Sequence, residues 1–226
     1  MPPRASKRKS APPNSSSVTS SDGRSVSNKA QTKGMGKTDR LFNTHVNSSL
    51  GMIDPEGIEA LCADLGVDYT DVRILMLAWK LKAGKQGYFT QDEWQTGLKA
   101  LGVDSQLKKE LPKLEKEVEK PSNYEDFYTY AFRYCLTEEK QKSVDIESIC
   151  ELLNLVLGVQ FRRQVASLVE YLKVQNDYKV INADQWINFL RFCKEISFPD
   201  LQNYDANQAW PLILDNFVEW VREKQS

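Results

Sequence analysis

Histidine and paired cysteines are scarce in this sequence of 226 residues. A single imidazole, that of His45, cannot build a His-rich metal site, and a Ser/His/Asp triad would have to use that one residue. The four cysteines are widely spaced and form no Cys-x-x-Cys motif, which excludes the usual zinc and redox motifs. Because each cysteine lies on or beside an apolar helical face, we expect buried, unreactive thiols. They are Cys62, Cys135, Cys150 and Cys193.

Long apolar runs and phosphate-binding loops are also missing. No stretch approaches the ~18 apolar residues that cross a bilayer, and the N-terminus lacks the apolar core of a signal peptide. Neither a G-x-x-x-x-G-K-[ST] loop nor a dinucleotide fingerprint occurs, and no motif marks out an acid–base pair among the 31 acidic residues. We therefore expect a protein of the nucleus or cytoplasm, with no membrane partner, metal, cofactor or catalytic residues of its own.

The charge is distributed unevenly along the chain. Residues 1–40 carry nine Lys and Arg against two acids, a net +7, which leaves −8 on the remainder of a chain whose total is −1. This segment is rich in Ser and Pro, so we expect a disordered basic tail. Its cluster Arg4-Ala-Ser-Lys-Arg-Lys9 reads either as a nuclear localisation signal or as a solubilising charge run. The acidic remainder favours a basic protein partner over nucleic acid.

Helical periodicity dominates from Pro55 onward. Ile58, Leu61, Cys62 and Leu65 recur at the i, i+3, i+4, i+7 spacing of one apolar helical face. Residues 72–81 are apolar nearly all round, which predicts a helix buried on most sides. Only two very short extended pieces, 87–89 and 180–181, interrupt the helices. The pattern predicts an all-α fold with two EF-hand-like helical subdomains and vestigial short strands.

Several residues predict where helices begin and end. Asp54 can cap a helix that starts at Pro55, and Asp68 or Thr70 can open the next one. Thr90-Gln-Asp-Glu93 is a capping box, in which each side chain satisfies a free backbone N–H. Pro112 predicts a break or a fresh start within the following helical stretch, since proline lacks an N–H donor.

The segment from Lys82 to Glu93 resembles an EF-hand loop, with Gly at the sharp turn and Glu at the end. A calcium-responsive adaptor is therefore the alternative function. However, Lys82, Gly84 and Gln86 occupy positions that should supply side-chain oxygens, and a Lys there repels Ca²⁺. We expect an EF-hand-like fold without metal.

The C-terminal region places acids around a small residue. Asp184 lies in the expected first turn of a helix, where a carboxylate complements the helix dipole, and Asp215 lies one turn into the last helix. Ala209 leaves room for an approaching group. This combination suits either a docking site for a partner's Lys or Arg, or plain helix-terminus electrostatics.

Five motifs occur together in order: Leu77-Ala-Trp-Lys-Leu81, Gly87-Tyr-Phe89, Asn203-Tyr-Asp205, Ala209-Trp-Pro211 and Asp215-Asn-Phe-Val-Glu219. Through them, roughly residues 42–222 resemble the defective-in-cullin-neddylation family, whose members are co-ligases. The basic start resembles the nuclear branch, which lacks a ubiquitin-associated domain. The resemblance implies a potentiating-neddylation domain over residues 41–222, with a conjugating-enzyme-binding half at 41–136 and a cullin-binding half at 137–222.

The resemblance also implies two binding sites and a non-covalent mechanism. Asp184, Ala209 and Asp215 would bind the winged-helix region at the cullin's C-terminal end. A hydrophobic cleft would take the acetylated N-terminal Met of the neddylation-conjugating enzyme. The plain interpretation of the apolar cleft residues is core packing. The cleft residues are Ile58, Ile74, Leu75, Leu77, Ala78, Leu81, Gln86 and Phe89.

Overall fold

The computed structural model describes residues 36–102 and 107–226, and residues 35–226 cluster as one compact unit. The basic cluster at residues 4–9 lies outside the described residues. The first helix begins at Lys37, so residues 37–40, which the sequence analysis assigns to the tail, are helical. Within the described ranges, no helix combines the length and the apolar character that crossing a bilayer requires.

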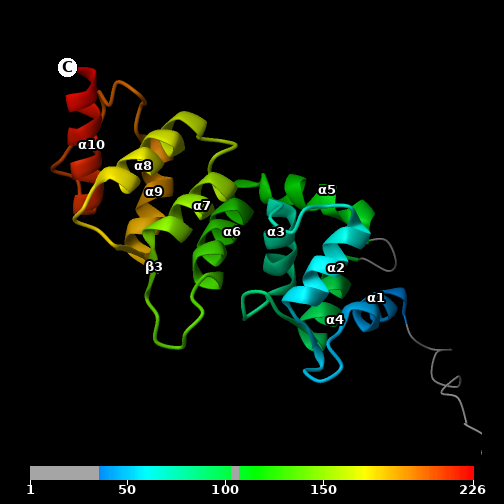
Figure 1. Cartoon of the computed structure of the whole chain (residues 1–226). Helices are drawn as coiled ribbons and strands as arrows, with labels where there is room; N and C mark the ends of the chain where they lie inside the picture. The colour runs from blue at the N-terminus through cyan, green and yellow to red at the C-terminus, as the bar shows by residue number, and fades with distance from the viewer. Residues whose placement is uncertain (1–35, 103–106) are drawn as a thin grey trace, which may run out of the picture. The chain divides into compact units, whose positions relative to one another are not determined.

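The N-terminal half contains two helix–loop–helix units whose loops pair through two-residue strands. The strands are antiparallel, with Ile53 opposite Phe89. A further helix follows this pair of units (Figure 1). In chain order the elements are α1 (Lys37–His45), β1 (Met52–Ile53), α2 (Pro55–Leu65), α3 (Val72–Leu81), β2 (Phe89–Thr90), α4 (Gln91–Ala100) and α5 (Leu107–Val118).

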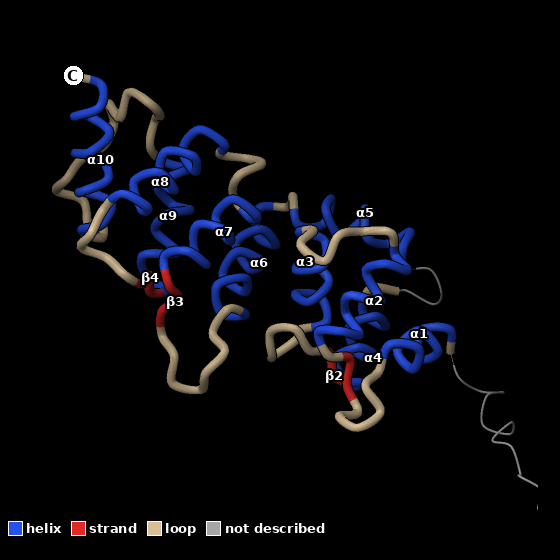
Figure 2. The backbone as a smooth tube through the Cα atoms, in the orientation of Figure 1, coloured by secondary structure: helices blue, strands red, loops and turns tan. Residues whose placement is uncertain are grey.

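The C-terminal half repeats this arrangement, with Val144 opposite Ile181 in its small antiparallel sheet. Figure 2 shows how little of the described chain is strand, which confirms the expected all-α fold with only short strands. The elements are α6 (Pro121–Tyr134), β3 (Ser143–Asp145), α7 (Ile146–Val156), α8 (Arg162–Val174), β4 (Val180–Asn182), α9 (Ala183–Glu195) and α10 (Leu212–Gln225).

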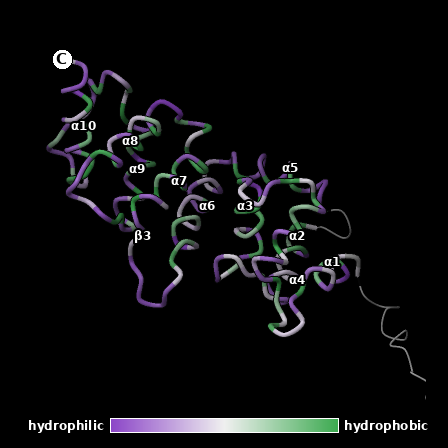
Figure 3. Tube along the Cα trace, viewed as in Figure 1, coloured by the Kyte–Doolittle hydropathy of each residue, from purple (hydrophilic) through white to green (hydrophobic). Residues whose placement is uncertain are grey.

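Short polar side chains cap the starts of α2, α3, α4, α7 and α9. Asp54 accepts a hydrogen bond from the Gly57 backbone N–H at 2.9 Å, and the predicted capping box of Thr90 and Glu93 is present. Polar residues therefore concentrate at helix ends and loops. In Figure 3 the loop before β3 is accordingly hydrophilic, whereas apolar positions recur along the helices.

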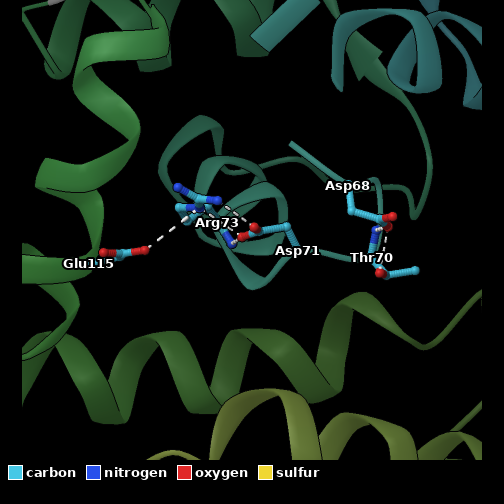
Figure 4. A network of polar contacts seen from close by, with 5 residues as sticks. All are labelled: Asp68, Thr70, Asp71, Arg73 and Glu115. Carbon is cyan, nitrogen blue, oxygen red and sulfur yellow. Dashed lines mark hydrogen bonds and ion pairs between the residues drawn. The ribbon is translucent and has the colours of Figure 1, made fainter. Parts of the chain in front are cut away.

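The start of α3 differs from the prediction. Its cap is Asp71, which accepts from the Arg73 N–H at 2.9 Å, and neither Asp68 nor Thr70 fills that position. Instead, an Asp68 carboxylate oxygen accepts from both the backbone N–H and the hydroxyl of Thr70 (Figure 4). Because Asp68 and Thr70 are hydrogen-bonded to each other in this local turn, neither caps the helix, and Asp71 takes that position.

The predicted break at Pro112 is wrong, because Pro112 lies inside the continuous helix α5. A proline within a helix removes one hydrogen bond and costs ~3 kcal/mol. The neighbouring Leu111 and Leu114 are buried, and α5 packs against both α3 and α6. Burial of this apolar face offsets the proline, so packing overrides the local preference.

Helix α6 packs on α3 and α5 of the N-terminal half as well as on α7 and α9 of its own half. On the C-terminal side, the Tyr128 hydroxyl donates to the Trp186 carbonyl at 2.7 Å, and the Trp186 indole N–H donates to the Tyr128 carbonyl at 2.9 Å. The two rings stack with centroids 4.3 Å apart. We call this reciprocal contact the α6–α9 clasp.

On the N-terminal side, α6 is joined to the α3 region by further polar contacts. The Trp79 indole donates to Asp126 at 2.8 Å, and the Tyr130 hydroxyl donates to the Ala83 carbonyl at 2.9 Å. The Tyr134 hydroxyl accepts from the Gly87 N–H at 3.2 Å. One helix thus fixes the position of structures on both of its sides.

Tyr128→Phe is expected to lower the free energy of unfolding by about 0.5–1.5 kcal/mol, because it removes the buried hydrogen bond to the Trp186 carbonyl, which keeps its donor within α9. Urea unfolding followed by far-UV circular dichroism measures the change. Tyr69→Phe is the matched control, since Tyr69 is 65% exposed, and it should unfold like the unaltered chain. Equal stability of the two variants would contradict the importance of the clasp.

Candidate functional site

A cavity of about 450 Å³ opens beside α2, α3 and β2. Six of the eight residues predicted for the conjugating-enzyme cleft line it, while Leu77 and Leu81 do not. Leu77 and Leu81 are 0% and 2% exposed and belong to the core. The lining residues among those predicted are Ile58, Ile74, Leu75, Ala78, Gln86 and Phe89.

The opposite wall of the cavity was not predicted from the sequence. It consists of Tyr134 and Cys135 at the end of α6, with Leu152 and Leu155 on α7. These residues lie far along the chain from α2 and α3, and their spacing reads as ordinary core packing. The cavity is therefore built from both halves of the unit.

Acidic side chains surround this apolar cavity. Glu56, Glu59 and Asp71 are among its lining residues, and a neighbouring hollow that shares Tyr69, Thr70, Gln86, Cys135, Leu152 and Leu155 with it adds Asp145 and Glu151. Among the described residues lining either space there is no Lys, Arg or His. The site therefore suits an apolar anchor attached to a neutral or basic segment.

The rim at the start of α3 is held by charged hydrogen bonds, shown in Figure 4. Arg73 Nε donates to Asp71 Oδ1 at 2.8 Å, and its Nη2 donates to Oδ2 at 2.5 Å. Glu115 on α5 lies 3.6 Å from Arg73 Nε. The side-chain hydrogen bond from Arg73 lowers the pKa of Asp71, so this rim carboxylate remains charged at neutral pH.

The cysteines and the histidine lie in settings unlike those of activated groups. Burial raises the pKa of Cys135 to about 11 and that of Cys193 to about 12, so both thiols remain protonated at neutral pH. A nucleophilic cysteine needs the opposite shift. His45 is buried at the end of α1, with Nε2 3.2 Å from Asp64 Oδ2, and does not line the cavity.

The residues predicted for cullin docking lie on α9, on α10 and between them. Asp184 is exposed in the first turn of α9, and its Oδ1 accepts from Asn188 at 3.3 Å. Ala209 is exposed directly before Trp210. Asp215 is half-buried on α10 and accepts a hydrogen bond from the Tyr204 hydroxyl.

Trp210 links these positions. Its ring stacks on Tyr204, with centroids 5.8 Å apart, and carries the guanidinium carbon of Arg191 4.1 Å above its centroid. Arg191 comes from α9, two turns after Asp184, so contacts run from α9 through Trp210 and Tyr204 to Asp215. Arg191 was not predicted from the sequence, because it does not stand out from ordinary helix residues, whereas Tyr204 belongs to the Asn203-Tyr-Asp205 motif but was not assigned to the site.

In the EF-hand-like loop at residues 82–93, backbone N–H groups of the loop occupy the carboxylate that would otherwise bind a metal ion. The two carboxylate oxygens of Glu93 accept from the N–H groups of Gly84 and Thr90, each at 2.8 Å. In the described part of the chain, no group of three or more His, Cys, Asp or Glu is placed to hold a metal ion. Since its terminal glutamate is already hydrogen-bonded, the loop has a stable form based on protein donors alone.

The helical fold and the sequence place the chain in one protein class. It belongs to the cullin-binding family, whose sequence model matches residues 106–220. Among curated relatives, DCN1-like protein 4 of Homo sapiens is 40% identical over 176 residues, which cover 77% of this chain and 59% of the relative. The chain thus spans about three fifths of that relative's length.

Two further relatives are covered more completely. DCN1-like protein 5 of Homo sapiens is 37% identical over 177 residues, covering 77% of this chain and 73% of the relative. DCN1-like protein 2 of Dictyostelium discoideum is 37% identical over 188 residues, covering 82% of this chain and 68% of the relative. These similarities confirm the family resemblance.

Addition of Ca²⁺ is expected to leave the thermal unfolding midpoint unchanged, because Glu93 already accepts two backbone hydrogen bonds. Glu93→Ala should lower the free energy of unfolding by about 1–2 kcal/mol, the usual effect of losing a helix cap. Differential scanning calorimetry with Ca²⁺ and with a chelator measures both effects. Glu138→Ala, in an exposed loop, is the control. A calcium-dependent midpoint would instead favour the adaptor function.

Proposed function

We propose that this chain promotes cullin neddylation as a non-covalent scaffold, or co-ligase. It would hold a conjugating enzyme at the apolar cavity and a cullin at the α9–α10 surface. The acceptor lysine then meets the thioester at high effective concentration. The observation that carries the proposal is the presence of two separate surfaces, one apolar and one acidic, on one compact unit of a cullin-binding family member.

The proposed occupant of the cavity is the acetylated N-terminal Met of the conjugating enzyme. A thioether side chain adapts to irregular apolar spaces, and its burial stabilises a complex by roughly 1.5–3 kcal/mol. Acetylation removes the charge of the terminal amine, which would be costly to bury beside Ile58, Leu75 and Phe89. The acidic rim then favours basic residues in the segment that follows.

The proposed cullin surface consists of Asp184, Ala209 and Asp215. The two acids would pair with basic residues of the cullin's C-terminal winged-helix region, while the small Ala209 side chain permits close approach. The hydrogen bond from Tyr204 orients the Asp215 carboxylate and leaves its second oxygen for a partner. The chain forms no covalent intermediate in this mechanism and only positions the two partners.

The whole function is tested by transfer of the modifier from the loaded conjugating enzyme to a cullin C-terminal domain. The chain should raise the initial rate at limiting concentrations of both partners. Adding either partner's isolated binding segment should suppress the increase by competition. An unchanged rate with and without the chain would overturn the proposed function.

At the cavity, an acetylated N-terminal peptide of the conjugating enzyme should bind at least tenfold more tightly than its unacetylated form. Leu75→Arg should abolish the difference, because Leu75 lines the cavity and is only half-buried, so the variant can fold. Ala78→Arg is a poorer probe, since Ala78 is 1% exposed and the larger side chain would disturb the core. Fluorescence anisotropy measures binding.

The matched control for the cavity is Leu50→Arg, which adds the same charge at an exposed leucine outside the lining. It should bind both peptides like the unaltered chain. Equal affinities of the unaltered chain for the acetylated and free peptides would show that the cavity has been given the wrong occupant.

At the docking surface, Ala209→Arg should weaken cullin binding tens- to thousands-fold, because it adds bulk and a cation facing the partner's cations. Loss of a hydrogen-bonded interfacial charge costs ~2–5 kcal/mol, so Asp184→Ala and Asp215→Ala should weaken binding as well. Higher salt should reduce the affinity of the unaltered chain. Calorimetric titration with a cullin C-terminal domain measures each affinity.

Ala166→Arg is the control for this surface, since Ala166 is an exposed alanine on α8. It should change the affinity little. If the three surface variants stay folded and bind as tightly as the control, the docking surface is wrongly located.

A further inference from the structure

Arg191 is a cation within the proposed acidic docking surface. Asp184, Asn188 and Arg191 follow one another on α9 at spacings of four and three residues, so they share one helical face. Arg191 also reaches the segment that contains Ala209, because its guanidinium lies over Trp210. A positive charge at Arg191 is not expected on a surface whose only role is to bind basic side chains.

The guanidinium of Arg191 is held in one orientation. The Trp210 ring lies 4.1 Å beneath it, and its Nε donates to the two carboxylate oxygens of Glu195 at 3.1 and 3.0 Å. Its Nη2 donates to the Gln208 side chain at 3.3 Å. These contacts restrict both the plane and the direction of the group, so binding a partner would cost little further side-chain entropy.

Part of this guanidinium remains available to a partner. An arginine side chain offers five N–H hydrogens and is always charged. Acceptors among the described residues engage Nε and one hydrogen of Nη2, which leaves three hydrogens open on a side chain that is 38% exposed. A planar group with several open N–H donors matches the two oxygens of a carboxylate.

We propose that Arg191 donates hydrogen bonds to a carboxylate of the docked cullin and so selects partners whose docking surface has mixed charge. The partner would present basic residues to Asp184 and Asp215 and an acidic residue to Arg191. A partner with a Lys at that place would face the guanidinium and be disfavoured, which makes Arg191 a specificity-determining residue. This inference rests on the proposed function.

Arg191→Gln should weaken binding of a cullin C-terminal domain about fivefold to tenfold, as expected for a half-exposed charged contact. Arg191→Lys should retain part of the affinity, because a Lys keeps the charge but lacks the planar fork. Arg191→Glu should bind most weakly. Titration calorimetry at low and physiological salt measures the affinities, with Arg163→Gln at an exposed site on α8 as the matched control.

Charge exchange separates this role from a merely structural one, in which Arg191 only supports Trp210. The Arg191→Glu chain is titrated against cullin domains in which exposed Asp and Glu residues are changed singly to Lys. One such change should restore at least tenfold in affinity to Arg191→Glu while weakening the unaltered chain.

Two results would overturn the inference while the unaltered chain still binds: equal or tighter binding by Arg191→Gln, or the absence of rescue by any charge exchange. Failure of the unaltered chain to bind the cullin domain at all would instead refute the proposed function, and the inference would fall with it.

Discussion

The reciprocal hydrogen bonds between Tyr128 and Trp186 fix the relation of α6 to α9, and both candidate sites depend on that relation. Asp184 lies two residues before Trp186 in the same helix, so the clasp sets where this carboxylate projects. Tyr134, at the C-terminal end of α6, forms part of the cavity wall. Movement of α6 would therefore alter both surfaces.

The clasp is effective because it is buried and fully satisfied. Two aromatic rings exclude water, and the buried hydroxyl of Tyr128 and indole N–H of Trp186 each find a backbone carbonyl as acceptor. Burial raises the pKa of Tyr128 well above its ordinary value, so the hydroxyl remains a donor at any physiological pH. Two further aromatic donors join α6 to the α3 region: Trp79 donates to Asp126, and Tyr130 donates to the Ala83 carbonyl. Helix α6 is therefore hydrogen-bonded to elements on both of its sides.

Periodicity and capping chemistry predicted most of the fold, because an apolar face at helical spacing and a side-chain cap are local signals. Local rules failed where contacts decided the outcome. Pro112 remains helical because its neighbours are buried, and Asp71 caps α3 because Asp68 is hydrogen-bonded to Thr70. These two differences reflect packing and competition for donors.

Site residues were predictable only where a motif marked them. Six cleft residues came from family resemblance and line one cavity, whereas Leu77 and Leu81 share the same helical pattern but do not line it. Periodicity cannot distinguish a core residue from a cavity wall on the same helix face. Arg191 gave no signal, since its importance arises from its position over Trp210, a contact between distant parts of the chain.

The shared lining of the cavity has a thermodynamic consequence. Its walls come from α2, α3 and β2 on one side and from α6 and α7 on the other, so an occupant contacts structures that would separate on unfolding. A ligand that binds only the folded chain stabilises it by RT ln(1 + [L]/Kd), about 2.7 kcal/mol at a hundredfold excess over Kd. Occupancy of this one cavity would therefore stabilise both subdomains against unfolding, and it would lower their rates of proteolytic cleavage and of amide hydrogen exchange.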